Sequence, residues 1–340
     1  MKLLVCGGAG FIGSAFVRRM LEQHADWEIV VYDKLTYAGN LDNLAPVAEN
    51  PRYSFVRGCI CDAAAVEGAI TGAGGVDAIV NFAAETHVDR SIDDPESFLR
   101  TDIFGTHTLL EAVRTHSIAK MVQVSTDEVY GSIDEGSFCE TDRIHPSSPY
   151  SASKAGGDLQ VLAYFTTYGT PALITRGSNT YGPYQYPEKL IPLFVTNALE
   201  GGKLPLYGDG LNVRDWLHVD DHADGIAAAL LRGEPGEVYN IGGGNERTNR
   251  EITTIILDEL GLEWGATVEQ VTDRPGHDRR YSITCAKAAE KLGWQPQIDF
   301  AEGLRDTIRW YRDNESWWSK IKHGTEEFAD WRKRWYDERA

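Results

Sequence analysis

The chain has 340 residues, of which 42% are hydrophobic, enough to bury a sizeable core in one large domain or two fused domains. It contains 33 Lys and Arg residues and 51 Asp and Glu residues, so the formal net charge is −18. This charge argues against nucleic acid or an anionic membrane surface as a partner. It does not exclude a phosphorylated small molecule, because the local placement of Lys and Arg matters more than their total.

The cysteines and the apolar runs bear on the location of the protein. The chain contains five cysteines without Cys-x-x-Cys spacing, and Cys59 and Cys61 are too close together for a zinc half-site. We therefore expect reduced thiols in a cytoplasmic protein, and no metal site. No signal peptide is evident, and no apolar run is long enough to cross a bilayer.

The first predicted elements are typical of a dinucleotide-binding unit. A short buried strand over Lys2–Cys6 runs into a glycine-rich turn and then into a helix over Ser14–His24. The glycines of this turn are Gly7, Gly10 and Gly13. Because they lack side chains, they allow a tight turn and a close approach of a pyrophosphate to the helix N-terminus. A glycine run alone can be an ordinary turn, but its position between a strand and a helix favours a dinucleotide site.

Asp33 indicates which dinucleotide is bound. It follows the second predicted strand, Ile29–Val31, and lies about 20 residues after Gly13, where a carboxylate can bind the ribose hydroxyls. A carboxylate in this place would repel a 2′-phosphate. We therefore expect NAD rather than NADP, although the neighbouring Lys34 weakens this preference slightly.

Strands and helices continue to alternate along the first half of the chain. Further strands are predicted at Tyr53–Arg57, Val76–Phe82, Met121–Ser125 and Ala172–Arg176, and helices at Pro95–His116 and Pro149–Tyr168. This alternation predicts an α/β fold with a doubly wound parallel sheet of the Rossmann type. We expect residues 1–180 to form the NAD-binding domain, with some later segments returning to it.

After about residue 176 the pattern changes. Loop residues dominate Ser178–Pro183, and further elements are predicted as a helix at Lys189–Leu199, a strand at Leu204–Tyr207, and helices at Val219–Leu231 and Arg250–Leu260. We expect residues 181–315 to form a smaller, mixed α/β substrate-binding region. Residues 316–340 should form a Trp-rich helical tail that docks on the body of the protein.

Polar side chains gather where the predicted strand Met121–Ser125 ends. Thr126, Asp127 and Glu128 follow this strand directly. Tyr150 and Lys154, four residues apart, share one face of the helix that begins near Pro149. A Tyr and a Lys at this spacing can occur by chance on a surface helix. Because ligands of open α/β sheets bind at the carboxyl ends of strands, we interpret this cluster as the reaction centre.

The residues of this cluster suggest an oxidation. Tyr150 is a poor base at its ordinary pKa of about 10, but the Lys154 ammonium and a cationic nicotinamide ring are expected to stabilise its phenolate. Tyr150 would then remove a hydroxyl proton while a hydride passes from the same carbon to NAD. Thr126 can hydrogen-bond the developing oxyanion.

The acid pair suggests that water is then eliminated. A solvated acidic turn is the alternative interpretation. Asp127 and Glu128 point in different directions, so they can address two neighbouring carbons of one substrate. Once a carbonyl has formed, one carboxylate can remove the acidic proton on the adjacent carbon while a carboxylic acid protonates a leaving hydroxyl. The hydride would return to the carbon that lost oxygen, so no external oxidant is consumed.

Several motifs carry a resemblance to a known family. They are Gly7–Gly13, Ala83–Ser91, Ser125–Gly131, Tyr150–Lys154, Tyr181–Tyr184, Pro187–Pro192, Arg214–Trp216 and Asp273–Asp278. With them the chain resembles the extended short-chain dehydrogenase/reductases and, within these, the dTDP-glucose 4,6-dehydratases, from Met1 to about Trp310. The Asp–Glu pair separates these dehydratases from the 4-epimerases, which share the Tyr and the Lys.

The resemblance implies a role for each residue of the reaction centre. Tyr150 is the base at the sugar 4-hydroxyl, helped by Thr126 and Lys154. Glu128 takes the C5 proton, and Asp127 protonates the departing 6-hydroxyl. The hydride leaves C4 and returns to C6, which gives dTDP-4-keto-6-deoxyglucose and water in deoxysugar biosynthesis.

The same resemblance, together with the glycine motif, implies two sets of binding residues. The expected NAD contacts are Gly7, Gly10, Phe11, Ile12, Gly13, Asp33, Lys34, Leu35, Thr36, Cys59, Ile60, Phe82, Ala83, Ala84, Glu85, Thr86, Thr101, Tyr150, Lys154 and Thr180. The expected nucleotide-sugar contacts are Thr86, Thr126, Asn179, Lys189, Leu190, Ile191, Pro192, Leu193, Phe194, Pro205, Leu206, Tyr207, Arg214, Asn249, Asp273, Arg274, Pro275, Gly276 and His277. Arg214 and Arg274 also suit a diphosphate, because a guanidinium forks onto its oxygens, although either could be a surface ion pair.

Three positions depart from the usual residues of the family. Cys59 stands where the family has an Asp that contacts adenine, and Thr180 stands where it has an Asn on the cofactor side. Asp102 replaces an Asn. The resemblance also implies a homodimer formed through a four-helix bundle, to which the helices Pro95–His116 and Pro149–Tyr168 would contribute.

Two other functions stay open at this point. One is a related NAD-dependent nucleotide-sugar dehydratase, epimerase or decarboxylase. The other is a catalytically idle NAD-binding scaffold or sensor.

Overall fold

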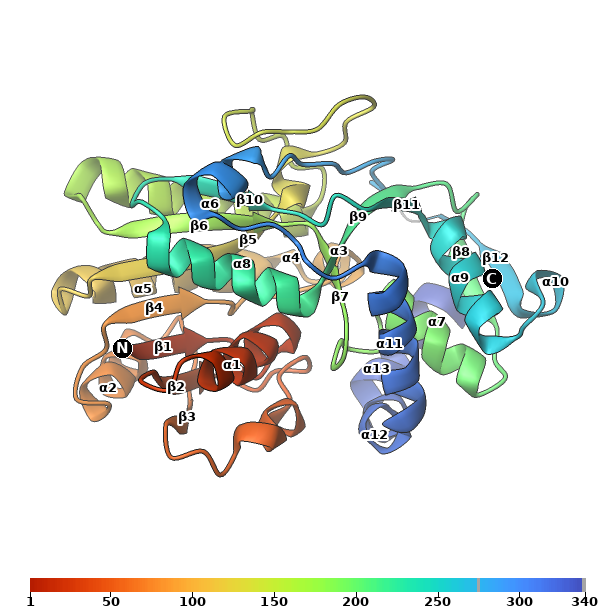
Figure 1. The fold of residues 1–340 in the computed structure, drawn as a ribbon, viewed down its shortest axis with the longest axis horizontal. Coiled ribbons are helices and arrows are strands. Elements are labelled where there is room, and N and C mark those ends of the chain that lie inside the picture. The colour runs from red at the N-terminus through yellow and green to blue at the C-terminus, as the bar shows by residue number, and fades with distance from the viewer. Residues whose placement is uncertain (274–275, 338–340) are drawn as a thin grey trace.

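The computed structural model describes residues 1–273 and 276–337, and side chains up to residue 335. A seven-stranded parallel sheet organises the larger part of the molecule, with the strand order β10-β6-β5-β4-β1-β2-β3 (Figure 1). Its strands are β1 (Lys2–Cys6), β2 (Glu28–Asp33), β3 (Tyr53–Arg57), β4 (Ala78–Asn81), β5 (Lys120–Thr126), β6 (Ala172–Gly177) and β10 (Val238–Ile241). The prediction of a doubly wound α/β fold is confirmed. The domain boundaries near residues 180 and 315 stay predictions.

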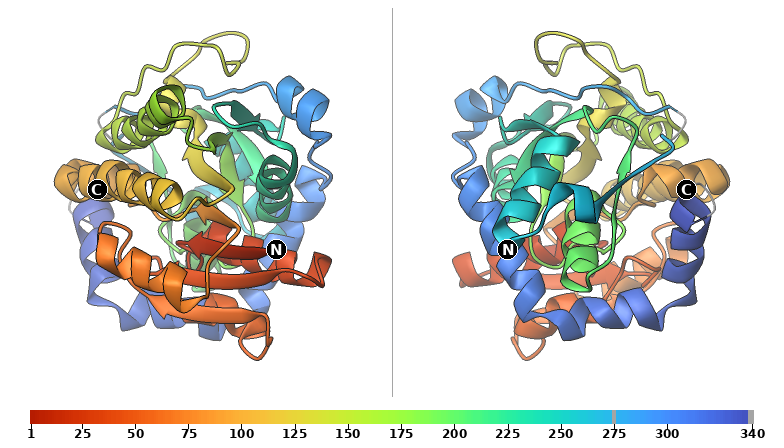
Figure 2. Two further views of the ribbon diagram at one scale, coloured as in Figure 1. Left: turned by 90° about the vertical axis from the view of Figure 1, so that its left-hand side faces the viewer. Right: turned by 90° about the vertical axis from the view of Figure 1, so that its right-hand side faces the viewer.

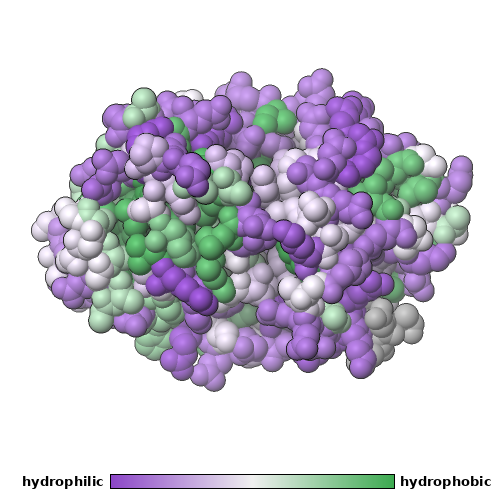
Figure 3. All heavy atoms as spheres, turned by 90° about the horizontal axis from the view of Figure 1, so that it is seen from below, coloured by the Kyte–Doolittle hydropathy of each residue, from purple (hydrophilic) through white to green (hydrophobic). Residues whose placement is uncertain are grey.

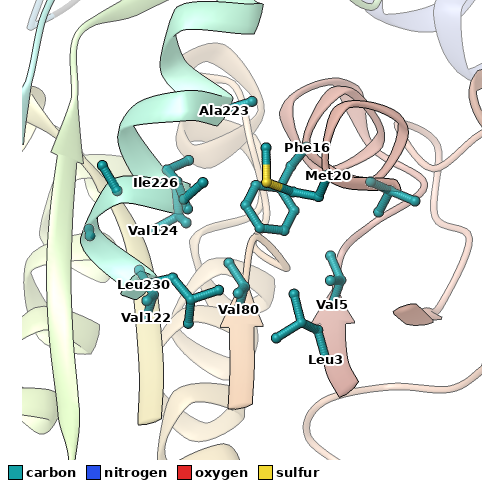
Figure 4. Packing of buried hydrophobic residues seen from close by; sticks show 14 of the residues in the cluster. Leu3, Val5, Phe16, Met20, Val80, Val122, Val124, Ala223, Ile226 and Leu230 are labelled. Atoms are coloured by element: carbon teal, nitrogen blue, oxygen red, sulfur yellow. The ribbon is translucent and has the colours of Figure 1, made fainter. Parts of the chain in front are cut away.

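Helices cover both faces of this sheet, as the end-on view on the left of Figure 2 shows. One face carries α1 (Phe11–Gln23) and α8 (Val219–Arg232), and the other carries α2 (Ala63–Gly72), α5 (Thr106–Thr115) and α6 (Pro149–Tyr168). Side chains of β1 alternate between the two faces, so Leu3 and Val5 join one core cluster while Leu4 and Cys6 join the other. Figure 4 shows the first cluster, in which side chains of α1 and α8 close over β1, β4 and β5.

The strand order explains where ligands can bind. β1 lies between β2 and β4, so the order reverses at β1 and leaves a crevice at the carboxyl ends of these strands. The helix α6 begins with a capping box between Ser148 and Ser151 and with Pro149 in its first turn. Its start therefore lies at a fixed place, which positions Tyr150 in the first turn.

The second part of the molecule is built on two small sheets and a separate core. Its strands are β7 (Asn179–Tyr181), β8 (Leu204–Tyr207), β9 (Val213–His218), β11 (Glu246–Thr248) and β12 (Val268–Val271). Its helices are α7 (Leu190–Leu199), α9 (Asn249–Leu260), α10 (Trp264–Thr267) and α11 (Phe300–Asp313). The three-stranded sheet has the order β11-β9-β7, and β12 pairs with β8. Side chains of α7, α9 and α11 share one hydrophobic cluster.

One local prediction is wrong, and another is confirmed with a difference in detail. Ser178–Pro183 was expected to be a loop, but residues 179–181 form β7, because they pair in parallel with β9. Pro95–His116 was expected to be a helix, and residues 95–115 are helical throughout. It consists of α4 (Pro95–Phe98), a π-helical segment η2 (Leu99–Gly105) and α5, preceded by the short α3 (Val88–Asp93). Long-range pairing and a widened helical turn leave no clear signal in local sequence.

The C-terminal tail packs on the body of the protein. It consists of α12 (Glu315–Gly324), α13 (Glu326–Arg332) and the π-helical segment η5 (Lys333–Asp337). The indole of Trp317 donates a hydrogen bond of 3.0 Å to the Asn43 side chain, which lies in the 3-10 helix η1 (Leu41–Val47). The tail therefore joins the second core to the large sheet.

The surface agrees with the acidic composition of the chain. Seen from below, most of the surface is hydrophilic, and hydrophobic residues gather in the left half of the view, the side of the large sheet, and in a smaller group at the upper right (Figure 3). Within the described residues, no helix has the length and hydrophobicity that a membrane span requires.

Candidate active site

Two neighbouring cavities are lined by the residues of the predicted site. The first lies over the glycine turn between β1 and α1 and has a volume of about 230 Å³. Gly7 adopts a left-handed φ of 74°, and a Cβ there would lie 2.4 Å from the backbone nitrogen of Ala83. A Cβ on Gly13 would lie 2.3 Å from the carbonyl oxygen of Gly7. The turn therefore needs glycine at both positions, and its bare backbone allows a phosphate to approach the N-terminus of α1.

Asp33 is held at the end of β2 by two backbone donors. Its Oδ2 accepts a hydrogen bond of 2.9 Å from the Ala9 N–H, and its Oδ1 accepts one of 2.8 Å from the Leu35 N–H. Burial raises the pKa of Asp33, and these two hydrogen bonds oppose the rise. The carboxylate thus has a fixed orientation at the edge of the first cavity.

Most of the predicted cofactor residues line this first cavity. They are Gly7, Gly10, Phe11, Ile12, Gly13, Asp33, Lys34, Thr36, Cys59, Ile60, Phe82, Ala83, Ala84, Glu85, Thr86, Thr101, Tyr150 and Lys154. Leu35 and Thr180 do not line it. The structure adds lining residues that the sequence did not indicate, among them Asn43, Tyr184, Gln185, Trp317 and Ile321. The last two come from the tail, whose aromatic spacing indicated docking but gave no sign of where.

The second cavity has a volume of about 170 Å³ and lies between the large sheet and the second core. The predicted substrate residues in its lining are Asn179, Lys189, Leu190, Ile191, Leu193, Phe194, Pro205, Leu206, Tyr207, Arg214, Asn249 and His277. Thr86 lines the first cavity instead, and Thr126, Pro192, Asp273 and Gly276 line neither. Arg274 and Pro275 lie outside the described residues. Additional lining residues are His87, Val88, Asp89, Thr180, Gln185, Glu188 and Trp216.

The two cavities meet at Tyr150, which lines both. Lys189 and Gln185 also line both cavities. The Lys189 ammonium donates a hydrogen bond of 3.2 Å to the hydroxyl of Thr86. A ligand in the first cavity and a ligand in the second would therefore approach each other at the phenol of Tyr150.

The two acids occupy different environments beside this junction. Asp127 begins a short 3-10 turn, η3 (Asp127–Tyr130), and is only 2% exposed, whereas Glu128 lines the second cavity. The Thr126 hydroxyl donates a hydrogen bond of 3.3 Å to Asp127 and accepts one of 3.2 Å from the Glu128 N–H. Within the described part of the chain, Asp127 Oδ2 makes no hydrogen bond.

Burial is the main reason why the pKa of Asp127 lies well above its usual value. The charges of Glu128 and Asp215 raise this pKa further, while Arg214 and the hydrogen bond from Thr126 oppose the rise. The direction of this shift favours the protonated form of Asp127, which a general acid requires.

The surroundings of Tyr150 differ from the sequence expectation. Burial raises the pKa of Tyr150 well above its usual value, the charges of Glu128 and Asp102 raise it further, and a hydrogen bond with Thr126 opposes them. Lys154 lies on the same helix, and its ammonium donates a hydrogen bond of 2.9 Å to the Val124 carbonyl. Without a bound cofactor, burial and the neighbouring acids thus hold the phenol pKa high, and its lowering by Lys154 together with a nicotinamide ring stays a prediction.

Arg214 is the buried guanidinium in the wall of the second cavity. It is 5% exposed and lies over the ring of Tyr281, 4.3 Å from its centroid. Its N–H groups donate to the carbonyl oxygens of Val213, at 2.7 Å, and Asp278, at 3.0 Å. These contacts fix the plane of the guanidinium, which then suits the oxygens of a phosphate or diphosphate.

Comparisons with known proteins agree with this geometry. The family model described as GDP-mannose 4,6 dehydratase matches residues 4–307. A dTDP-glucose 4,6-dehydratase of Streptomyces antibioticus is 54% identical over 327 residues, which are 95% of this chain and 96% of that protein. The chain belongs to this dehydratase family. Its fold is that of the extended short-chain dehydrogenase/reductases, to which this family belongs.

Solved structures of the family have the same fold. The dTDP-glucose 4,6-dehydratase of Streptomyces venezuelae, solved with NAD bound, is 56% identical, with a TM-score of 0.92 over 95% of this chain and 100% of that one. A UDP-glucose 4-epimerase of Thermus thermophilus, in complex with NAD, is 32% identical, with a TM-score of 0.85 over 92% of this chain and 100% of that one. The fold is therefore shared between dehydratases and epimerases, and the side chains of the site must distinguish them.

Proposed function

We propose that this chain is a dTDP-glucose 4,6-dehydratase, an NAD-dependent hydro-lyase that forms dTDP-4-keto-6-deoxyglucose and water. The observation that carries the proposal is the pair Asp127 and Glu128, of which one is buried and the other lines the second cavity, beside a phenol shared by two cavities. The full-length likeness to dTDP-glucose 4,6-dehydratases at 54–56% identity supports it.

The first cavity fits NAD. The bare backbone of Gly7 and Gly13 suits its pyrophosphate, and the oriented carboxylate of Asp33 suits the ribose hydroxyls of a cofactor without a 2′-phosphate. Bound NAD would accept two electrons from the sugar C4 and return them to C6.

Tyr150 takes the proton of the 4-hydroxyl in this proposal. Its phenol lies where the two cavities meet, and the hydrogen bond with Thr126 favours its ionised form. The protein's own charges raise the pKa of Tyr150, so its ionisation depends on a positive charge brought by the ligands. The ammonium of Lys154 lies next to this site, because it donates a hydrogen bond to the Val124 carbonyl.

The acid pair eliminates water from the 4-keto sugar. Glu128 removes the proton on C5, which the neighbouring carbonyl makes acidic, and the resulting electron pair forms the C5–C6 double bond as the C6–O bond breaks. Asp127 gives its proton to the departing oxygen, so hydroxide leaves as water. The raised pKa of Asp127 supports its role as the acid, and the position of Glu128 in the wall of the second cavity supports its role as the base.

The second cavity receives the nucleotide part of the substrate. Arg214 and Lys189 supply positive charge for the diphosphate, and Asn249 lines the same wall. Thymine is preferred over other bases on the likeness to the named relatives.

A homodimer is part of this proposal. Large apolar side chains are exposed on neighbouring segments, with exposed fractions of 47% for Leu99, 65% for Phe104, 53% for Leu159, 40% for Phe165 and 55% for Tyr168. They lie on η2 and α6, the segments that would contribute to a four-helix bundle with a second copy. A cytoplasmic location stays a prediction from the cysteine content.

Turnover of a substrate panel tests the proposal. The purified chain, without added NAD, is incubated with dTDP-glucose, UDP-glucose, GDP-mannose and a nucleotide-linked uronic acid, and the masses of the products are measured by mass spectrometry. We expect dTDP-glucose to yield a product lighter by one water. A product of unchanged mass would indicate an epimerase, loss of carbon dioxide from a uronic acid substrate a decarboxylase, and no turnover at all an idle scaffold or sensor.

A further inference from the structure

Asp102 is a buried carboxyl group behind the proposed reaction centre. It lies in the π-helical segment η2 and is 2% exposed. Its Oδ2 accepts a hydrogen bond of 2.5 Å from the Ser153 hydroxyl, and its Oδ1 accepts one of 3.2 Å from the Glu85 N–H. A Cβ on Gly157 would lie 2.8 Å from the Asp102 carbonyl oxygen, so α6 packs directly against this turn.

One partner of the carboxyl lines the first cavity, and the other lies beside residues that line it. Ser153 lies on α6 between Tyr150 and Lys154, and Glu85 lines the first cavity in the segment that follows β4. Thr101, the residue before Asp102, also lines this cavity and donates a hydrogen bond of 3.2 Å to the Glu85 carboxylate. One carboxyl group thus ties the helix that carries Tyr150 and Lys154 to the segment that borders the cofactor cavity.

The charges around Asp102 come from several elements. Lys154 on α6 attracts its negative charge, Glu85 repels it, and the same charge raises the pKa of Tyr150. Burial raises the pKa of Asp102 to about 6, while Lys154, the Ser153 hydroxyl and the Glu85 N–H oppose this rise.

Other titratable groups on the neighbouring helices are engaged elsewhere. Arg100 of η2 pairs with Glu96 of α4 at 3.1 Å on the surface, and the His107 ring of α5 hydrogen-bonds the Tyr164 hydroxyl. Lys154 is therefore the cation with the strongest electrostatic effect on the Asp102 carboxyl.

We propose that Asp102 is a positioning residue that, as a carboxylate, clamps the catalytic helix to the segment after β4. Protonation of its Oδ2 weakens this clamp, because the Ser153 hydroxyl can then donate only to its other acceptor, the Tyr150 carbonyl oxygen, 2.8 Å away. The inference rests on the proposed function, because the clamp acts on Tyr150 and Lys154. An Asn, the residue that the resemblance leads one to expect here, does not titrate in this range, and its amide oxygen can still accept the hydrogen bond from Ser153 at every pH. The consequence is an acid limit of activity that this chain has because of Asp102.

Two substitutions should move this acid limit in opposite directions. Asp102→Asn removes the titrating group and its negative charge beside Tyr150, so the acid limb of turnover against pH should move down by about one pH unit. Ser153→Ala keeps the carboxyl but removes a donor that stabilises its ionised form, so the acid limb should move up. A merely structural role would lower both rates without opposite shifts.

Infrared titration of the carboxyl group gives a readout that needs no turnover. The band of the protonated Asp102 carboxyl is the one that the wild type shows and Asp102→Asn lacks. In the wild type this band should appear as the pH falls through about 6. In Ser153→Ala it should appear at a higher pH than in the wild type. Absence of this band across roughly pH 5–8 would overturn the proposal, as would identical normalised pH profiles of the wild type and Asp102→Asn. A different result would count against the dehydratase function. If the Asp102 carboxyl titrates as expected but the chain dehydrates no nucleotide sugar, the proposed function is wrong, and Asp102 has no role in that reaction.

Discussion

The two cavities are built in different ways, although they meet at one phenol. The first cavity lies over a glycine turn at the carboxyl end of β1, where a side chain on Gly7 or Gly13 would collide with neighbouring backbone. The second cavity is assembled from side chains of separate segments, such as Glu128 after β5, Lys189 before α7, Arg214 in β9 and Asn249 at the start of α9. The difference suggests that cofactor binding depends on local backbone geometry, whereas substrate recognition and elimination depend on individual side chains.

Removing the phenol at the junction should have the largest effect, because both halves of the site need it. Tyr150→Phe keeps the ring and its packing but removes the group that accepts the 4-hydroxyl proton. We expect turnover of dTDP-glucose to fall by about 10⁴-fold, measured as product formation. NAD content after purification should not change. Substantial turnover by this variant would contradict the role of Tyr150.

Removing both acids should slow the elimination of water but leave the oxidation at C4 in place. Asp127→Asn combined with Glu128→Gln keeps the size of both side chains, and we expect dehydration to fall by about 10³-fold. Oxidation at C4 should persist, so the absorbance of the reduced cofactor should accumulate on the enzyme. Normal dehydration by the double variant would show that the acids are assigned wrongly.

A change in the second cavity should affect substrate affinity more than rate. Arg214→Lys keeps the positive charge but loses the forked donors and the contact with Tyr281. We expect KM for dTDP-glucose to rise about tenfold, equivalent to about 1.4 kcal/mol, with a smaller change in kcat. Arg279→Lys is the matched control, because Arg279 is exposed and pairs with Asp209. An equal effect of both substitutions would mean that Arg214 does not bind the substrate.

Two glycine-to-alanine substitutions should distinguish a local effect on NAD binding from a general effect on stability. Gly13→Ala would place a Cβ 2.3 Å from the Gly7 carbonyl oxygen, so the turn must shift and the amount of NAD retained on purification should fall. The control Gly68→Ala lies inside the helix α2, where a Cβ meets nothing within 4 Å. It should stabilise the chain by about 0.5–1 kcal/mol, measured by denaturant unfolding, because alanine is the better helix former. Full NAD retention by Gly13→Ala would contradict the account of the first cavity.

This contrast also explains how much of the structure the sequence revealed. The strands Tyr53–Arg57 and Leu204–Tyr207 were predicted with their observed bounds, since each is a short run with a clear pattern. The glycine turn and Asp33 were likewise visible, because their geometry is encoded within a few residues. Tertiary pairing made β7 from a segment that looks like a loop, and Trp317 reaches the first cavity from the far end of the chain. Such placements depend on contacts between distant residues, which one sequence does not display.

The three residues that depart from the family pattern also show that one sequence does not reveal contacts between distant residues. The sequence marked Asp102 as a substitution but gave no sign that it joins Ser153 to Glu85. Thr180, expected on the cofactor side, lines the second cavity and hydrogen-bonds the His222 ring at 2.8 Å. Cys59 does line the first cavity. The physical consequence of a substitution thus depended on the neighbours that the fold brings to it.

The central claim is that the hydrogen taken from C4 is returned to C6 of the same sugar during the loss of water. The most direct measurement uses dTDP-glucose carrying deuterium at C4 and locates the label in the product by nuclear magnetic resonance. We predict that the deuterium appears at C6 and that C5 exchanges its hydrogen with the solvent. Retention of the label at C4, or its release to water, would contradict the mechanism.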